Sequence, residues 1–167
     1  LVYFGPVLPK YFGSLGNTFI WKKISVTARL TYKLGHFFRR PGIEYNTLTT
    51  STFQHEELAT RWRNPGDELI TTVPSMPYPN SSNRDAFYLN SEIMVEKADH
   101  VRLQFITVNY AFPLQKMKAS KIKKLEAYFN ANNIGLLWTA NKYGIDPEYI
   151  SNLQPSKSFA VGLKMSF

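Results

Sequence analysis

The sequence has no cysteine, which excludes disulfides and thiolate metal sites. Charged residues make up only 19% of it, and no apolar run approaches the ~18 residues that a transmembrane helix needs. Catalytic motifs are also missing: there is no GxSxG, phosphate-binding loop or GxGxxG, and the HEEL stretch at His55 is not an HExxH zinc site. We therefore expect a protein that is not an enzyme and that has no catalytic, cofactor-binding or metal-binding residues.

The alternation of apolar and polar residues is the most informative feature that is present. In the last ten residues it is unbroken: Phe159, Val161, Leu163, Met165 and Phe167 alternate with Ser158, Ala160, Gly162, Lys164 and Ser166. A period of two is that of a β-strand with one oily face. Ten residues tilted by about 45° also match a strand that crosses a bilayer. A half-buried strand of a soluble sheet has the same pattern, so one strand does not decide between the two.

The same alternation returns at four places upstream. It is clearest in Ile24–Leu34, where one face has five consecutive polar residues, and it also occurs in Tyr11–Trp21 and, more weakly, in residues 125–137. Within residues 101–112 the parity changes near Phe105, which predicts either a β-bulge or a strand end that packs on loops. About five strands with one apolar and one wet face are typical of a membrane barrel wall.

The connections between these strands alternate between short and long. Lys22-Lys23 is a tight turn and residues 114–124 form a short basic connection, whereas residues 39–90 and 139–157 are long excursions. Outer-membrane barrels have long loops outside and short turns on the periplasmic side. If the last strand runs inward, both long connections lie outside. Strand parity does not impose this order, so the order is a separate argument for a barrel.

The net charge of +8 raises the question of a nucleic-acid partner. The densest cluster comprises Lys116, Lys118, Lys121, Lys123 and Lys124, which could form either a short amphipathic helix that touches phosphates or a solvated turn. No aromatic stacking platform lies beside it, and the sequence has no helix-turn-helix, zinc-finger or RNP-type motif. We expect a solvated turn and no nucleic-acid partner.

Paired carboxylates occur in both long connections. They are Asp67 and Glu68 in the first, and Asp146 and Glu148 in the second. A glycosidase needs such a pair facing across a cleft. Solvated loop acids are far commoner, and we expect these four residues to be of that kind.

Five segments of the chain carry distinctive motifs. They are residues 9–35 (strand-turn-strand), TRWRNPGDE at 60–68, VRLQFITVNYAFP at 101–113, the strand and Asp-Pro-Glu loop at 128–148, and the terminal SFAVGLKMSF. In this order they resemble the C-terminal end of a SusC/RagA-type TonB-dependent outer-membrane receptor of the Bacteroidetes. In the fourth segment Tyr143 and Gly144 are adjacent, whereas the family's motif separates them by one residue. The resemblance covers nearly the whole chain.

The resemblance implies that the fold is all-β and that residues 1–167 are the last strands, about five, of a large antiparallel transmembrane β-barrel with long extracellular loops. It implies a bacterial outer-membrane nutrient importer for oligosaccharides or peptides. The implied partners are the remainder of the same barrel with its plug domain, a SusD-like surface lipoprotein as a lid, TonB through an N-terminal part that these residues lack, and membrane lipid. About five strands cannot close a barrel, since the smallest need about eight, so we expect the other strands to come from elsewhere.

Candidate contacts with a ligand or with the lid lie in the two long loops. Arg61 and Arg63 can pair with carboxylates through two parallel hydrogen bonds, and Trp62 offers a flat face to sugars or aromatic groups. Tyr143 and Asp146 are the candidates in the second loop. Alternatively, Trp62 only pins its loop to the neighbouring chain.

Two other classes of protein compete with the importer. The first is a soluble all-β carbohydrate-binding domain that uses Trp62 and exposed tyrosines. It would not require detergent for extraction. The second is a basic nucleic-acid module, which would show a steep salt dependence of binding.

Overall fold

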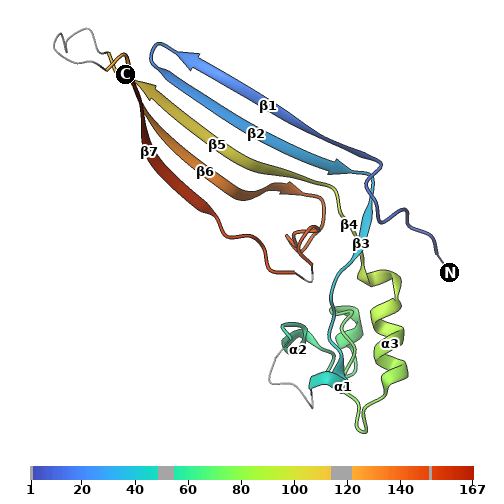
Figure 1. Cartoon of the computed structure of the whole chain (residues 1–167). Coiled ribbons are helices and arrows are strands. Elements are labelled where there is room, and N and C mark those ends of the chain that lie inside the picture. The colour runs from blue at the N-terminus through green and yellow to red at the C-terminus, as the bar shows by residue number, and fades with distance from the viewer. Residues whose placement is uncertain (1, 49–54, 114–121, 151) are drawn as a thin grey trace. The chain divides into compact units, whose positions relative to one another are not determined.

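The computed structural model of the chain describes residues 2–48, 55–113, 122–150 and 152–167 (Figure 1). The chain forms two compact units. The sheet unit comprises Leu8–His36 and Ala98–Phe167, and the loop unit comprises Leu1–Val7 and Phe37–Lys97. The long excursion between two strands is therefore folded as a unit with its own contacts.

The sheet unit contains one antiparallel sheet of five strands in the order β1-β2-β5-β6-β7 (Figure 1). The strands are β1 (Tyr11–Trp21), β2 (Ile24–Leu34), β5 (His100–Ala111), β6 (Lys124–Thr139) and β7 (Ser158–Ser166). The five predicted strands are confirmed, and so is the tight turn at Lys22-Lys23, across which Trp21 pairs with Ile24. The sheet is not closed, because β1 and β7 each have one neighbouring strand within the described ranges.

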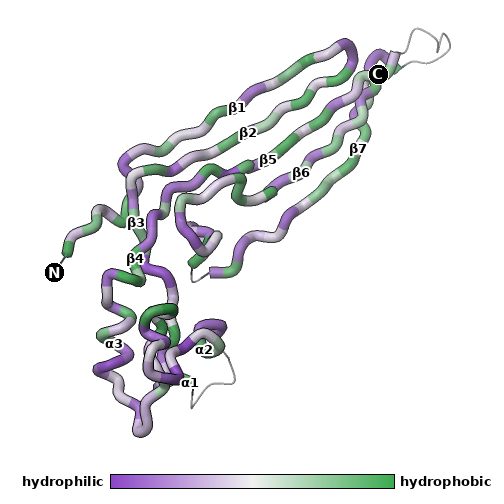
Figure 2. The backbone as a smooth tube through the Cα atoms, turned by 180° about the vertical axis from the view of Figure 1, so that it is seen from behind, coloured by the Kyte–Doolittle hydropathy of each residue, from purple (hydrophilic) through white to green (hydrophobic). Residues whose placement is uncertain are grey.

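The strand register places most apolar residues of the five strands on one face; Phe12, Ile20 and Phe105 are exceptions that share the parity of Lys33, Ser25 and Arg29. Residues that pair across antiparallel strands point to the same side of a sheet. One cross-strand row of this apolar face consists of Phe19, Val26, Val108, Phe129 and Val161. The adjacent row, on the polar face, consists of Thr18, Thr27, Thr107, Asn130 and Ala160. Figure 2 shows the resulting alternation of hydrophobic and hydrophilic positions along the strands.

The apolar face is exposed. Val161 retains 79% of its accessible surface, Phe19 66% and Leu163 64%. Of the sheet-unit residues that the structure describes, only Ala98 and Ala131 are apolar and buried. Within the described residues, the sheet unit therefore leaves most of its apolar face uncovered.

A β-bulge at Gln104 explains the change of parity in β5. Leu103 pairs with Leu30 and Phe105 pairs with Arg29, so the pairing of β5 with β2 skips Gln104. The register with β6 shifts at the same level. Phe105 therefore lies on the polar face, where its ring centre is 5.3 Å from the Arg29 guanidinium carbon, while Leu103 stays on the apolar face. Of the two predicted explanations, the bulge is confirmed.

Aromatic residues lie near both ends of the apolar face. At the turn-side end, which carries the Lys22-Lys23 turn, Trp21 and Tyr110 both pair with Ile24. At the opposite, loop-side end, Tyr32 and Trp138 both pair with Val101. The two levels are eight positions apart on β2, which corresponds to ~26 Å along the strand at ~3.3 Å per residue. The apolar face is therefore a band with an aromatic rim at each end.

Two glycines make room for tyrosine rings of the neighbouring strand. A Cβ atom added to Gly13 would lie 2.7 Å from Tyr32 Oη, and one added to Gly162 would meet the Tyr128 ring in the same way. At Gly16 the nearest atom to such a Cβ is Arg29 Nε, at an ordinary 3.9 Å. Ring-over-glycine packing of this kind fixes the register of adjacent strands.

The loop unit combines short helices with a two-stranded sheet. Its elements are β3 (Phe37–Arg39), α1 (Tyr45–Leu48), α2 (Glu57–Thr60), the 3₁₀ turn Asp67–Leu69, α3 (Ser82–Asn90), the 3₁₀ turn Glu92–Met94 and β4 (Val95–Lys97). Ile43, Tyr45, Val73, Tyr88 and Met94 form its core. The sequence did not predict these helices: α3 (SNRDAFYLN) is rich in weak helix formers and has no clear apolar stripe.

Helices in the described ranges do not reach the length and apolar character that a membrane span requires. The basic cluster falls mostly outside the described residues, which exclude Lys116, Lys118 and Lys121. Lys124 begins β6 and Lys123 directly precedes it, so this part of the cluster belongs to the turn-side end of the sheet.

Candidate functional site

A buried carboxylate, four residues before Arg61, links three segments of the loop unit. Glu57, the first residue of α2, accepts hydrogen bonds from the Arg40 guanidinium, from the Ile43 backbone N–H (2.8 Å) and from the Tyr88 hydroxyl (3.1 Å). Burial, together with the negative charge of Glu57, raises the pKa of Tyr88 to about 12, so its hydroxyl remains a donor. Glu57 therefore fixes the position of α2 within the loop unit, and Arg61 directly follows this helix.

Trp62 is tied to its own loop by both of its N–H groups. Its backbone N–H donates to the Val73 carbonyl (3.0 Å), and its indole N–H donates to the Asn64 carbonyl. The side chain still keeps 36% of its surface exposed. These bonds fit the interpretation that Trp62 pins the loop, and the exposed part of the ring leaves a face for contact.

Arg61 and Arg63 are oriented by carbonyl groups of α2. Arg61 donates to the Leu58 carbonyl (2.5 Å), and Arg63 donates to the Ala59 carbonyl (3.2 Å). A guanidinium group has five N–H donors. One bond to the helix fixes each side chain and leaves donors for an anionic group.

A carboxylate-capped turn follows this stretch and explains its sequence. Asp67 accepts hydrogen bonds from the backbone N–H groups of Arg63 and Asn64, both at 2.9 Å. These two bonds hold the pKa of Asp67 below its ordinary value. The turn passes through Gly66 at φ +101°, a conformation that favours glycine.

Two open cavities meet at the two arginines. The first, of about 450 Å³, is lined by His55, Glu56, Leu58, Ala59, Arg61 and Arg63. The second, of about 460 Å³, is lined by Arg61, Trp62, Arg63, Ser75, Met76, Pro77 and Tyr78. The second places guanidinium groups beside apolar and aromatic surface, including the fully exposed Tyr78. It is suited to a ligand or a partner segment that carries a carboxylate next to an apolar group.

A second polar cluster anchors the 140–157 connection to the loop-side end of the sheet. Arg102 of β5 contacts Asp146 (Nη2–Oδ2 2.5 Å) and Glu148 (Nε–Oε2 3.0 Å), and the Tyr149 ring centre lies 5.1 Å from its guanidinium carbon. Lys33 contacts Glu148 as well, at 2.5 Å. Burial opposes the charge of Glu148, but the hydrogen bond from Lys33 and the charge of Arg102 outweigh it and lower its pKa. The prediction that Asp146 and Glu148 are solvated loop acids is wrong.

Two histidines lie in this anchor cluster. His100 is 2% exposed; its Nδ1 lies 2.7 Å from the Ala98 carbonyl and its Nε2 3.6 Å from Glu148 Oε1. The ring centre of His36 is 5.9 Å from that of His100, and its Nδ1 is 3.8 Å from Asp99 Oδ1. Burial, followed by the neighbouring His100, lowers the pKa of His36. His36 is therefore neutral at neutral pH.

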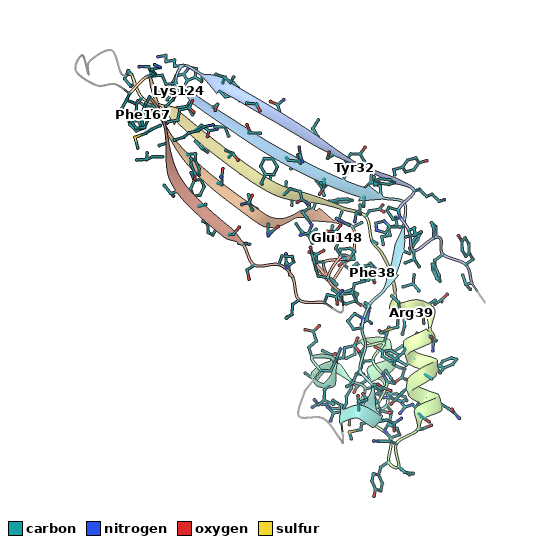
Figure 3. The ribbon with its side chains drawn as sticks, in the orientation of Figure 1. Tyr32, Phe38, Arg39, Lys124, Glu148 and Phe167 are labelled. Atoms are coloured by element: carbon teal, nitrogen blue, oxygen red, sulfur yellow. The ribbon has the colours of Figure 1, made fainter. Side chains whose placement is uncertain are left out.

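The five sequence-predicted residues belong to both units. Residues 61–63 line the second cavity of the loop unit together, whereas Tyr143 is half exposed in the sheet unit. Asp146 is engaged by Arg102, so its carboxylate positions a loop (Figure 3 labels the adjacent Glu148). Arg102 and His100 were missed, because a strand sequence gives no sign of which loop returns over its end. Groups of His, Asp or Glu able to hold a metal ion are absent from the described residues.

No protein-family model matches the chain, and no curated protein matches its sequence. Solved structures of the RagAB peptide importer share its fold. The open-open state aligns with a TM-score of 0.66 at 20% identity over 96% of this chain and 17% of that chain. The closed-closed state aligns with a TM-score of 0.70 at 20% identity over 99% and 18%. A third structure, of the RagAB peptide transporter, aligns with a TM-score of 0.59 at 25% identity over 92% and 17%.

The chain thus spans less than a fifth of the length of the solved proteins that it resembles. At these identities the likeness establishes the fold: an open antiparallel sheet that matches part of a large barrel-containing transporter.

Proposed function

We propose that this chain supplies part of the barrel wall and two external loops of a SusC/RagA-type, TonB-dependent nutrient importer in the bacterial outer membrane. Within this proposal the remaining strands and the plug belong to the same barrel, TonB supplies the energy, and a SusD-like lipoprotein covers the outer opening. The fold likeness to the RagAB peptide importer supports this class. The imported substrate is an oligosaccharide or a peptide, and the chain itself performs no chemistry.

The observation that carries the proposal is the exposed apolar face of the sheet. The two aromatic rims lie ~26 Å apart along the strands, or ~20 Å in height at a tilt of about 40°, which is comparable to the outward apolar band of ~25 Å between the aromatic girdles of an outer-membrane barrel. A soluble β-domain would cover this face with a second layer. Residues such as Val161 and Leu163 instead remain more than half exposed. The polar face, with Thr18 bonded to Thr27 at 2.9 Å, then faces the lumen.

Arginine substitutions on the two faces test the barrel wall. We expect Val161→Arg, on the apolar face near mid-strand, to cost about 2–4 kcal/mol of folding free energy in a bilayer. The matched control Ala160→Arg, on the polar face of the same strand, should be mild. Equilibrium unfolding of the complete barrel in lipid vesicles measures both. Equal tolerance of the two substitutions would contradict a lipid-facing apolar side.

In the loop unit we propose that Arg61, Trp62 and Arg63 contact the ligand or the lid. The double substitution Arg61→Gln/Arg63→Gln should weaken this contact by more than about tenfold, since one charge-assisted hydrogen bond already contributes about 1.5–3 kcal/mol. Lys97→Gln, an exposed basic residue of the same unit, is the control. Uptake of labelled oligopeptides and oligosaccharides, and co-purification of the lipoprotein, are the measurements. Unchanged uptake and co-purification would limit the stretch to a structural role.

A further inference from the structure

The turn-side end of the sheet carries positive charge that is not balanced locally. The described residues of this end (19–26, 108–113, 122–128 and 161–167) include five lysines and one acidic side chain. The lysines are Lys22, Lys23, Lys123, Lys124 and Lys164. The carboxylate, Glu126, contacts Lys124 at 2.7 Å and pairs in register with Lys164. Lys22, Lys23 and Lys123 are exposed and lie outside this group, which itself has one more lysine than acidic side chains.

The loop-side end has a smaller excess of positive charge. Its described residues (8–13, 31–36, 98–103, 136–150 and 152–158) include five lysine or arginine side chains and three acidic side chains. The carboxylates of Asp146 and Glu148 lie against Arg102 and Lys33. The excess of positive charge is therefore larger at the turn-side end than at the loop-side end.

Lysine side chains at the turn-side end lie at the rim of the apolar face. Lys22 Nζ is 5.1 Å from the ring centre of Trp21, which is an exposed residue of the apolar face. Lys123 donates its backbone N–H to the Ser166 carbonyl (2.7 Å), which extends the pairing of β6 with β7 and gives Lys123 the parity of Leu125 on the apolar face. Figure 3 shows Lys124 and Phe167 together at this end. Ammonium groups and apolar surface thus lie next to each other at the turn-side end of the sheet.

We propose that the turn-side end of the sheet binds the phosphate groups of anionic phospholipids in the adjoining membrane leaflet. The proposal rests on the proposed function, because it needs the apolar face to contact lipid. A lysine stem can lie along apolar surface while its ammonium group reaches a headgroup, and aromatic rings favour the same depth. A ligand with both a phosphate and acyl chains fits this combination, whereas a nucleic acid would leave the apolar half of the site unused. Basic side chains near an anionic membrane surface add to binding one by one.

Quenching by brominated lipids tests which lipid lies at the turn-side end. The complete barrel is reconstituted in vesicles of phosphatidylcholine with phosphatidylglycerol at one fixed ratio, with bromine on the acyl chains of either lipid. The contribution of Trp21 is the difference in fluorescence between the wild type and Trp21→Phe. We expect brominated phosphatidylglycerol to quench Trp21 about threefold more per lipid than brominated phosphatidylcholine. The triple variant Lys22→Gln/Lys23→Gln/Lys123→Gln should reduce this ratio to about one. The control Lys142→Gln/Lys157→Gln, in the loop-side connection, should retain it.

The outcomes separate this inference from the function on which it rests. Equal quenching of wild-type Trp21 by the two lipids would overturn the inference and leave the barrel wall intact. Absence of quenching by either lipid would overturn the barrel wall as well. Loss of the preference on adding inorganic phosphate, but not chloride at equal ionic strength, would assign the lysines to a small-anion site and overturn the lipid assignment.

Discussion

At the scale of single residues, the anchor cluster at the loop-side end makes the protein sensitive to acid. The lowered pKa of His36 means that the folded chain binds its proton less readily than the unfolded chain, so its stabilising effect is complete above the ordinary value of 6.5 and is lost as the pH falls. Glu148, whose pKa is also lowered, acts in the same direction below 4.5. Both groups therefore weaken the anchor on acidification, His36 first.

We expect amide hydrogen exchange of residues 140–150, corrected for intrinsic rates, to accelerate severalfold between pH 7 and about 5. In His36→Gln the acceleration should begin only near the range in which Glu148 gains its proton. The turn-side hairpin, which lacks these groups, is the internal control. The same acceleration in the hairpin would indicate general unfolding and contradict a local anchor.

At the scale of elements, the packing of Tyr128 over Gly162 makes a prediction about the β6–β7 seam. Gly162→Ala should cost about 1 kcal/mol, because the new methyl group displaces the ring and the cross-strand pair is lost. Gly16→Ala, on the same face but with open space, should be neutral or stabilising by a few tenths of a kcal/mol, since alanine restricts the unfolded chain. Urea unfolding of the folded barrel in lipid measures both. A stabilising Gly162→Ala would show that the ring yields without cost.

The sequence predicted the five strands of the sheet well, because apolar and polar residues alternate along most of each strand. It left the interruption in β5 open between two explanations, since a single unpaired residue and an end packed on loops change the parity alike. The helices of the loop unit could not be predicted: their packing depends on the Arg40–Glu57 pair, which brings together residues that no periodicity connects. The candidates at 61–63 came from unusual residue types, whereas the anchor role of Asp146 required knowledge of Arg102 across the sheet.

At the scale of the whole molecule, the open edges of β1 and β7 predict how the chain behaves by itself. Each edge presents unpaired backbone groups, and the apolar face adds exposed hydrophobic surface. We expect the isolated chain to aggregate in water and to remain polydisperse in detergent, as measured by size-exclusion chromatography with light scattering. Co-expression with the remaining strands of a barrel should produce one defined species. A monodisperse, detergent-free monomer would instead favour a soluble β-domain.

The bulge at Gln104 has one more consequence. If Gln104 were deleted, β5 could keep only one of its two halves in its present orientation. Either Leu103 would turn to the polar side, or Ile106, Val108 and Tyr110 would do so together. The strands that pair with β5 would have to change register in the same way. The loss of a single residue would therefore reverse which side chains point to the apolar face at one end of the sheet. An insertion elsewhere in β5 could restore the phase, and the position at which it did so would map how far the two halves depend on each other.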